Sequence, residues 1–211
     1  MTASYNQMEK MMRLAPVIPV ITIPALDQAV PLARALVAGG LRVLEVTLRT
    51  SCALEAIAAI AREVPDAIVG AGTVITPRHL DDVARAGGKF CVSPGATLAL
   101  IQTARDAQMQ LLPGAVTASE VMNLLSWDIN FMKFFPAEAA GGTAVLKSLA
   151  APLGEARFCP TGGIKPSNAR SYLQLPNVLC VGGTWVCPTD LMADGNWAAI
   201  EVLAAEATKL I

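Results

Sequence analysis

The stretch Phe131-Met132-Lys133-Phe134-Phe135-Pro136-Ala137-Glu138 is a run of bulky apolar residues that contains one lysine and ends at a proline. Bulky apolar side chains are typical of a buried strand. Pro136 cannot continue a central strand, because it has no N–H group to donate to a neighbouring strand. The sequence therefore predicts a short buried strand over residues 130–135 that stops where Pro136 begins a loop.

The same pattern recurs along the whole chain. Seven other short apolar stretches, most of them followed by Gly or Pro, each precede a segment with helical periodicity. The predicted strands cover residues 17–22, 42–49, 68–72, 89–93, 110–112, 130–135, 156–159 and 177–181. The predicted helices cover residues 27–38, 51–63, 77–86, 97–107, 118–125, 143–151, 167–173 and 196–209. Such alternation predicts parallel strands joined by right-handed helical crossovers.

Eight strand-and-helix units predict a single α/β domain, a (β/α)8 TIM barrel over residues 1–211. Residues 1–15 are expected to form an extra N-terminal helix that packs on the barrel, because Met8, Met11 and Met12 recur at helical spacing. The alternative is an open doubly wound sheet. That fold would need a nucleotide-binding loop near the first strand, and the sequence shows none there.

Composition and charge exclude several classes of function. A formal net charge of −1 and the lack of a basic run give no reason to expect a nucleic-acid partner. Three prolines interrupt the apolar run over residues 14–26, so neither a signal peptide nor a membrane span is expected, and the protein is predicted to be cytoplasmic. Five scattered cysteines without a CxxC pair are expected to be reduced thiols. His79 is the only histidine, which excludes a multi-histidine metal site, and no metal or cofactor is expected.

Polar side chains gather where the predicted strands end, the edge at which barrels of this kind carry their reactive groups. The polar residues predicted at this edge are Glu45, Arg49, Thr73, Lys133, Thr161 and Thr184. Along residues 42–49, a period of two places Glu45, Thr47 and Arg49 on one face and apolar side chains on the other. A buried strand with an acid, a hydroxyl and a guanidinium on one face indicates a site rather than ordinary core.

Lys133 is a candidate nucleophile. Burying a charged ammonium among apolar residues is costly, which favours the neutral amine. A neutral amine attacks carbonyl carbon, so Lys133 is a candidate for forming a Schiff base. The alternative is a lysine at the end of its strand that extends its amine to water.

Three other residues have a functional and a structural interpretation. Glu45 suits proton transfer during imine chemistry, although it could instead form an ion pair with Arg49 on the same face. Arg49 suits two-point binding of a carboxylate, assisted by the Thr73 hydroxyl. The structural alternative for Thr73 is a turn or helix-capping residue.

Two glycine pairs, 162–163 and 182–183, follow the last two predicted strands. Small residues there allow backbone N–H groups to converge on an oxyanion, and these two loops form the usual phosphate site of a barrel. The alternative is that the glycines only allow tight turns. The presence of both pairs, each beside a threonine, favours phosphate binding.

Six segments together resemble the class I 2-keto-3-deoxy-6-phosphogluconate (KDPG) aldolases, also known as 4-hydroxy-2-oxoglutarate (KHG) aldolases. They span nearly the whole chain in the order of that family. The segments are Leu44-Glu45-Val46-Thr47-Leu48-Arg49-Thr50, Val69-Gly70-Ala71-Gly72-Thr73-Val74, Leu112-Pro113-Gly114, Lys133-Phe134-Phe135-Pro136-Ala137-Glu138, Arg157-Phe158-Cys159-Pro160-Thr161-Gly162-Gly163 and Val181-Gly182-Gly183-Thr184-Trp185.

The resemblance implies a (β/α)8 barrel that assembles as a homotrimer and acts on a small keto-acid phosphate. It implies that Lys133 forms the Schiff base with pyruvate C2 and that Glu45 is the general acid and base. Arg49 and Thr73 would bind the pyruvate carboxylate, and Thr161 would contact the substrate near the new stereocentre. The residues implied to bind phosphate are Gly162, Gly163, Gly183 and Thr184, and those implied to line the pocket wall are Pro94 and Phe135.

Two departures from the family pattern concern substrate fit. Thr184 stands where serine is common, so the hydroxyl is kept and a methyl group is added. Ala96 stands where a larger aliphatic residue is frequent. The expected reaction is cleavage of KDPG to pyruvate and glyceraldehyde 3-phosphate. The alternatives are the same chemistry on 4-hydroxy-2-oxoglutarate or on the galactonate epimer, and a phosphosugar-binding barrel or epimerase without a covalent lysine. A metal-dependent aldolase is disfavoured by the single histidine.

Overall fold

The structure is a computed structural model that describes the backbone of residues 3–210 and the side chains of residues 7–210. The ends of the predicted domain, residues 1–2 and 211, lie outside the described residues. The strands are β1 (Val17–Ile21), β2 (Val43–Thr47), β3 (Ile68–Gly72), β4 (Phe90–Val92), β5 (Gln110–Leu112), β6 (Phe131–Phe134), β7 (Arg157–Pro160) and β8 (Val181–Gly183). The α-helices are α1 (Ala3–Met12), α2 (Ala29–Ala38), α3 (Ala53–Glu63), α4 (Pro77–Arg85), α5 (Leu98–Asp106), α6 (Ala118–Leu125), α7 (Gly142–Ala150), α8 (Pro166–Leu173), α9 (Thr189–Ala193) and α10 (Trp197–Ala207).

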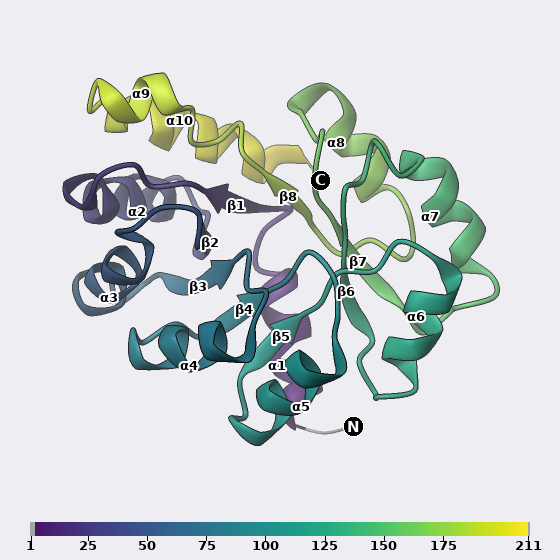
Figure 1. The fold of residues 1–211 in the computed structure, drawn as a ribbon. Helices are drawn as coiled ribbons and strands as arrows, with labels where there is room; N and C mark the ends of the chain where they lie inside the picture. The colour runs from purple at the N-terminus through teal and green to yellow at the C-terminus, as the bar shows by residue number, and fades with distance from the viewer. Residues whose placement is uncertain (1–2, 211) are drawn as a thin grey trace.

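The strands form a curled parallel sheet of six strands in the order β5-β4-β3-β2-β1-β8, together with a parallel pair, β6-β7. Pairing of β8 with β1 brings the last strand back beside the first. Isolated bridges join Gly114 to Lys133 and Thr161 to Gly182, between the two sheets. Figure 1 shows most of the helices on the outside of the strands. The prediction of an α/β fold with parallel strands is confirmed.

Three of the turns that lead from a strand into a helix end at a threonine cap. The side chains of Thr76, Thr97 and Thr117 accept hydrogen bonds from the first turns of α4, α5 and α6. Thr117 also forms a reciprocal capping box with Glu120. Such caps satisfy N–H groups that have no partner within the helix, so each helix begins at a fixed distance from the strand before it.

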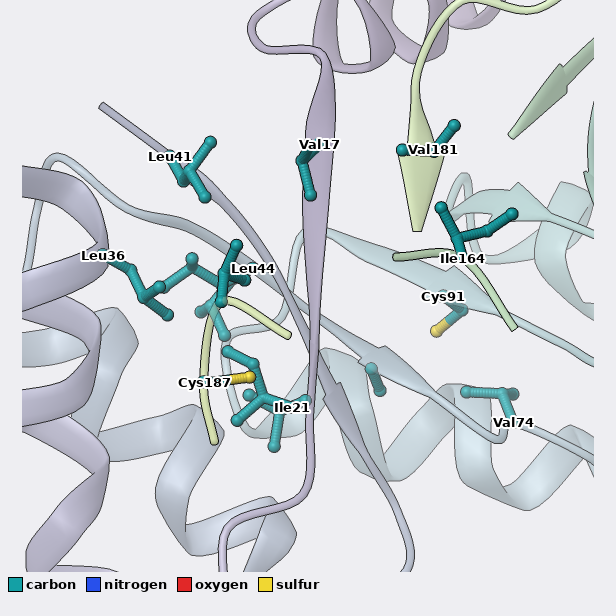
Figure 2. Packing of buried hydrophobic residues seen from close by; sticks show 14 of the residues in the cluster. Val17, Ile21, Leu36, Leu41, Leu44, Val74, Cys91, Ile164, Val181 and Cys187 are labelled. Atoms are coloured by element: carbon teal, nitrogen blue, oxygen red, sulfur yellow. The ribbon is translucent and has the colours of Figure 1, made fainter. Parts of the chain in front are cut away.

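The core has two parts, one on each face of the strands. Leu44 and Val46 of β2 pack with the surrounding helices in the larger cluster. Figure 2 shows part of this cluster, with Leu36 of α2 beside Leu44, and Ile21 beside Cys187. Val43 belongs instead to the inner cluster, so the predicted alternation along β2 is confirmed.

The inner cluster is closed at one end by α1. Met8, Met11 and Met12 of this helix pack with inward-facing side chains of the strands. Their partners include Phe90 at the start of β4 and Phe131 at the start of β6. Because those residues begin their strands, α1 lies at the end of the sheet opposite to the strand carboxyl ends.

Two elements differ from the sequence prediction by more than a shift of one to three residues at an end. The strand predicted over residues 177–181 begins only at Val181. Asn177 and Leu179 instead exchange backbone hydrogen bonds with Phe158 of β7, so the chain contacts β7 before it pairs with β1. Helix α9 was not predicted, because five residues are too few to show a helical period. Between residues 3 and 210, no helix is long and apolar enough to cross a membrane.

Candidate active site

A lysine of the β6-β7 pair and a glutamate of the six-stranded sheet meet between the two sheets. Lys133 Nζ of β6 donates a hydrogen bond of 3.0 Å to Glu45 Oε1 of β2. The two side chains are only 7% and 4% exposed. This burial excludes the alternative in which Lys133 extends to water. The amine lies among apolar residues and has one carboxylate partner, Glu45.

The backbone of Lys133 is hydrogen-bonded to the segment that follows β5. Its N–H donates to Pro113 O at 2.8 Å, and its carbonyl accepts from Ala115 at 2.9 Å. The Phe135 ring lies beside the amine, with 5.3 Å between Nζ and the ring centroid. The amine therefore has an aromatic wall on one side and the carboxylate on another.

Two glycines make room for this arrangement. A Cβ atom on Gly72 of β3 would lie 2.2 Å from Glu45 Oε1, so a larger residue there would force the carboxylate to shift. A Cβ atom on Gly114 would lie 2.1 Å from Pro94 O, so the predicted wall residue Pro94 lies against the segment that bridges to Lys133. Neither glycine was predicted as a site residue, although a glycine in or beside a strand is a signal of close approach.

Arg49 and Thr73 meet beside the carboxyl ends of β2 and β3. Arg49 Nε donates to Thr73 Oγ1 at 3.1 Å, and the guanidinium remains exposed. Thr73 has a φ of 61°, a left-handed conformation that β-branched residues rarely adopt. Strain of this kind is concentrated at functional sites. The Glu45–Arg49 ion pair that the sequence left open does not form, since each side chain has another partner.

The predicted phosphate residues lie at the carboxyl ends of β7 and β8. Gly162 and Gly163 have φ values of 102° and 77°, so this turn needs glycine for its conformation. Thr161, just before it, is buried and forms a bridge with Gly182. That bridge brings the turn next to β8, whose last residue, Gly183, precedes the exposed Thr184.

Other polar or hollow features of the molecule lie apart from these residues. His79, in the first turn of α4, accepts a hydrogen bond from the Ile75 N–H. A cavity of about 370 Å³ lies at the opposite ends of β5 and β6, lined by Met8, Trp127 and Phe131 among others. None of the predicted site residues lines it. Within the described residues, no group of three or more His, Cys, Asp or Glu side chains could hold a metal ion.

An amine that can attack a carbonyl needs a nearby group that takes up its proton, and Lys133 and Glu45 meet this requirement. Their place among parallel strands, with the exposed guanidinium of Arg49 at the carboxyl end of β2, defines an aldolase of the Schiff-base class. The family model for KDPG and KHG aldolase matches residues 8–203, and the chain belongs to this family. The resemblance found in the sequence is confirmed, and the protein is an aldolase, a lyase.

Named relatives cover nearly the whole chain. The 2-dehydro-3-deoxy-phosphogluconate aldolase of Dickeya dadantii is 53% identical over 199 residues, which are 94% of this chain and 93% of that protein. The KDPG aldolase of Legionella pneumophila is 45% identical to this chain, with a TM-score of 0.93. The match covers 95% of this chain and 98% of that one. That structure was solved with pyruvate captured at low pH as a covalent carbinolamine intermediate. The KDPG aldolase of Zymomonas mobilis ZM4, solved with 3-phosphoglycerate, is 50% identical with a TM-score of 0.93, covering 98% and 97%.

Proposed function

We propose that this protein reversibly cleaves KDPG into pyruvate and glyceraldehyde 3-phosphate through a Schiff base on Lys133. The buried 3.0 Å contact between Lys133 and Glu45 is the observation that carries this proposal. Relatives named as 2-dehydro-3-deoxy-phosphogluconate aldolases support the substrate. The carbinolamine captured in the Legionella enzyme supports covalent chemistry with pyruvate.

The first half of the reaction joins the substrate to the amine. Glu45 takes up a proton of Lys133, and the neutral amine attacks the C2 ketone of the substrate. Glu45 returns this proton to the hydroxyl group of the resulting carbinolamine, which leaves as water, and the carbinolamine becomes a protonated imine. This cation draws electrons from the neighbouring bonds, so it serves as the electron sink for cleavage.

The second half breaks the C3–C4 bond. Glu45, acting through a water molecule, takes the proton of the C4 hydroxyl, the aldehyde leaves, and the bonding electrons form an enamine. Glu45 then returns a proton to C3, and water hydrolyses the imine to release pyruvate and Lys133. Proton transfer by a positioned group of this kind contributes about 10²–10⁴-fold to the rate.

The remaining residues hold the two ends of the substrate. Arg49 binds the pyruvate carboxylate. The Thr73 hydroxyl, which already accepts a hydrogen bond from Arg49, assists. The backbone at Gly162, Gly163, Gly183 and Thr184 binds the phosphate. Thr161, between β7 and β8, contacts the substrate near the new stereocentre. Pro94 and Phe135 form the pocket wall.

The two sheets form one closed (β/α)8 barrel in this proposal. In a ring of eight strands β2 and β6 lie opposite each other, so side chains that meet at 3.0 Å must both point to the axis. The bridges beside β6 and β7 support closure, and α1 then covers the lower end of the barrel. We also propose a cytoplasmic homotrimer. The exposed side chains of Ile75 and Leu98, which follow the paired strands β3 and β4, would be covered by another subunit.

The family favours one alternative substrate, because it includes enzymes that act on 4-hydroxy-2-oxoglutarate. The extra methyl group of Thr184 lies at the phosphate site, where it would affect phosphorylated substrates alone. The ratio of kcat/KM for KDPG and 4-hydroxy-2-oxoglutarate decides between the two substrates. A ratio well above one supports KDPG as the substrate.

Borohydride trapping tests the covalent step. Incubation with pyruvate and borohydride should add one reduced pyruvyl group, which peptide mapping should place on Lys133. Lys133→Ala should lose trapping and turnover together. A phosphosugar-binding barrel or epimerase would bind phosphate without any pyruvate adduct, and cleavage that persists in Lys133→Ala would refute the proposal.

A further inference from the structure

A buried tyrosine holds an acidic residue in the loop that follows Lys133. Tyr172 of α8 is 1% exposed, and its hydroxyl donates a hydrogen bond to Glu138 Oε1. Glu138 lies in the loop between β6 and α7, at the surface. Figure 1 shows α7 and α8 on the side of the molecule where β6 and β7 lie. Burial, and next the hydrogen bond with Glu138, raise the pKa of Tyr172, so its hydroxyl keeps its proton and remains a donor.

The same glutamate lies against the glycine turn that is proposed to bind phosphate. Its N–H donates to Gly162 O at 3.1 Å. Its side chain crosses Gly163, where an added Cβ would lie 2.6 Å from Glu138 Cγ. Glu138 therefore touches both glycines, with its main chain at one and its side chain at the other.

Asn168 of α8 holds the turn through a separate set of hydrogen bonds. Its Nδ2 donates to Gly163 O at 3.1 Å, and its Oδ1 accepts from the Lys165 N–H at 2.8 Å. Helix α8 thus holds the Gly162–Gly163 turn in two ways. Asn168 binds the turn directly, and Tyr172 acts on it through Glu138. The turn depends on both contacts, because glycines at positive φ have few conformational restraints of their own.

A carboxylate beside an anion-binding turn would repel phosphate if it were free to move. The Tyr172 hydroxyl fixes its position and takes up one of its lone pairs. We infer that Glu138 and Tyr172 are positioning residues that set the Gly162–Gly163 turn at a fixed distance from Lys133, and so select substrates that carry a phosphate. This inference rests on the proposed function.

The geometry gives this pair a specific effect on substrate binding. The loop from Phe135 to Glu138 begins beside Lys133 and ends on the phosphate turn. A substrate bound covalently at one end and by its phosphate at the other must match the distance that this loop sets. Loss of the tyrosine hydroxyl should therefore weaken phosphate binding while leaving imine formation with pyruvate unchanged.

The test compares KM for KDPG with the half-saturating pyruvate concentration for borohydride trapping. Tyr172→Phe and Glu138→Ala should raise KM for KDPG about three- to tenfold, the range that corresponds to one lost hydrogen bond. Both variants should keep kcat and the pyruvate half-saturation near wild type. Glu138→Gln keeps an oxygen that can accept from Tyr172 and should restore most of the affinity. Ser148→Ala, which removes an exposed hydroxyl that bonds to Ala144 O within α7, is the matched control and should change nothing.

Each result distinguishes this inference from its rivals. Equal weakening of KDPG and pyruvate in Tyr172→Phe and Glu138→Ala would show a general structural role and overturn the inference. No change in either would overturn it as well. A lower KM in Glu138→Ala would mean that the carboxylate only repels phosphate. Failure of the proposed function has a different signature, since the wild-type protein itself would then fail to trap pyruvate or to cleave KDPG.

Discussion

Gly72→Ala should separate the two reacting groups without altering either of them. Gly72 ends β3, and an alanine Cβ at this position would lie 2.2 Å from Glu45 Oε1. The same Cβ would lie 2.8 Å from both Cγ and Cδ of Glu45. Other neighbours cannot absorb the clash, because the three nearest atoms all belong to the Glu45 side chain. The carboxylate must therefore move.

The required movement follows from the contact distances. Real Cβ atoms essentially never approach another atom to less than 3.0 Å, so the carboxylate oxygen must retreat by about 0.8 Å. A retreat of this size disturbs its 3.0 Å contact with Lys133. Misplacement of a reacting group by about 1 Å can cost about 10²-fold in rate, so we expect kcat to fall roughly 10- to 100-fold.

The assay follows pyruvate release from KDPG by a coupled dehydrogenase. Borohydride trapping should persist in Gly72→Ala, because Lys133 is still present. Gly154→Ala is the control, since a Cβ there meets only Ala150 O at 3.8 Å. If Gly72→Ala is folded and cleaves KDPG at the wild-type rate, the Glu45 carboxylate does not need its present position, and the reasoning is wrong.

Three other perturbations test the site and its scaffold. Glu45→Gln should slow cleavage by about 10²–10⁴-fold while pyruvate trapping persists, and full activity would remove Glu45 from the mechanism. Hydrogen bonds from the Thr117 and Val116 backbone lower the pKa of Glu120 from 4.5. The stabilisation by Glu120 is thus complete above that value and lost as the pH falls through the lowered pKa, so Glu120→Gln should reduce the free energy of unfolding in urea at neutral pH but not in strong acid. Burial raises the pKa of the Cys91 and Cys187 thiols to about 12, so iodoacetamide should modify them only after unfolding, and rapid native labelling would contradict their burial.

The alternation of strands and helices could be read from the sequence because each strand is a short apolar run with turn residues after it. The strand β3 (Ile68–Gly72) and the helix α6 (Ala118–Leu125) lie where they were predicted. β8 was misplaced for a physical reason. Residues 177–180 are as apolar as a strand, but this segment contacts β7 first, and only Val181–Gly183 pairs with β1. Hydropathy does not indicate which neighbouring strand an apolar segment will pair with.

The residues of the candidate site could be proposed from the sequence, and Arg49 contacts Thr73 as expected, but no local pattern gives the contact between Glu45 and Lys133. A period of two places Glu45 and Arg49 on one face, which makes them apparent partners within one strand. The structure instead pairs Glu45 with Lys133, 88 residues away. Tyr172 and Glu138 were missed for the same reason, since 34 residues separate them. Contacts of this kind depend on how the strands curl, and no local pattern contains that information.

The Lys133–Glu45 pair is better explained by chemistry than by stability. Removing two charges from water costs more free energy than a single contact of 3.0 Å returns in most proteins, so apolar residues of similar volume would stabilise this position better. The surrounding residues nevertheless preserve the pair, because Gly72 leaves space for the carboxylate and the Lys133 backbone is held on both sides. An amine that attacks a carbonyl carbon needs a proton acceptor within hydrogen-bonding distance. The buried carboxylate meets that need, and this explains why the fold retains two charges in its interior.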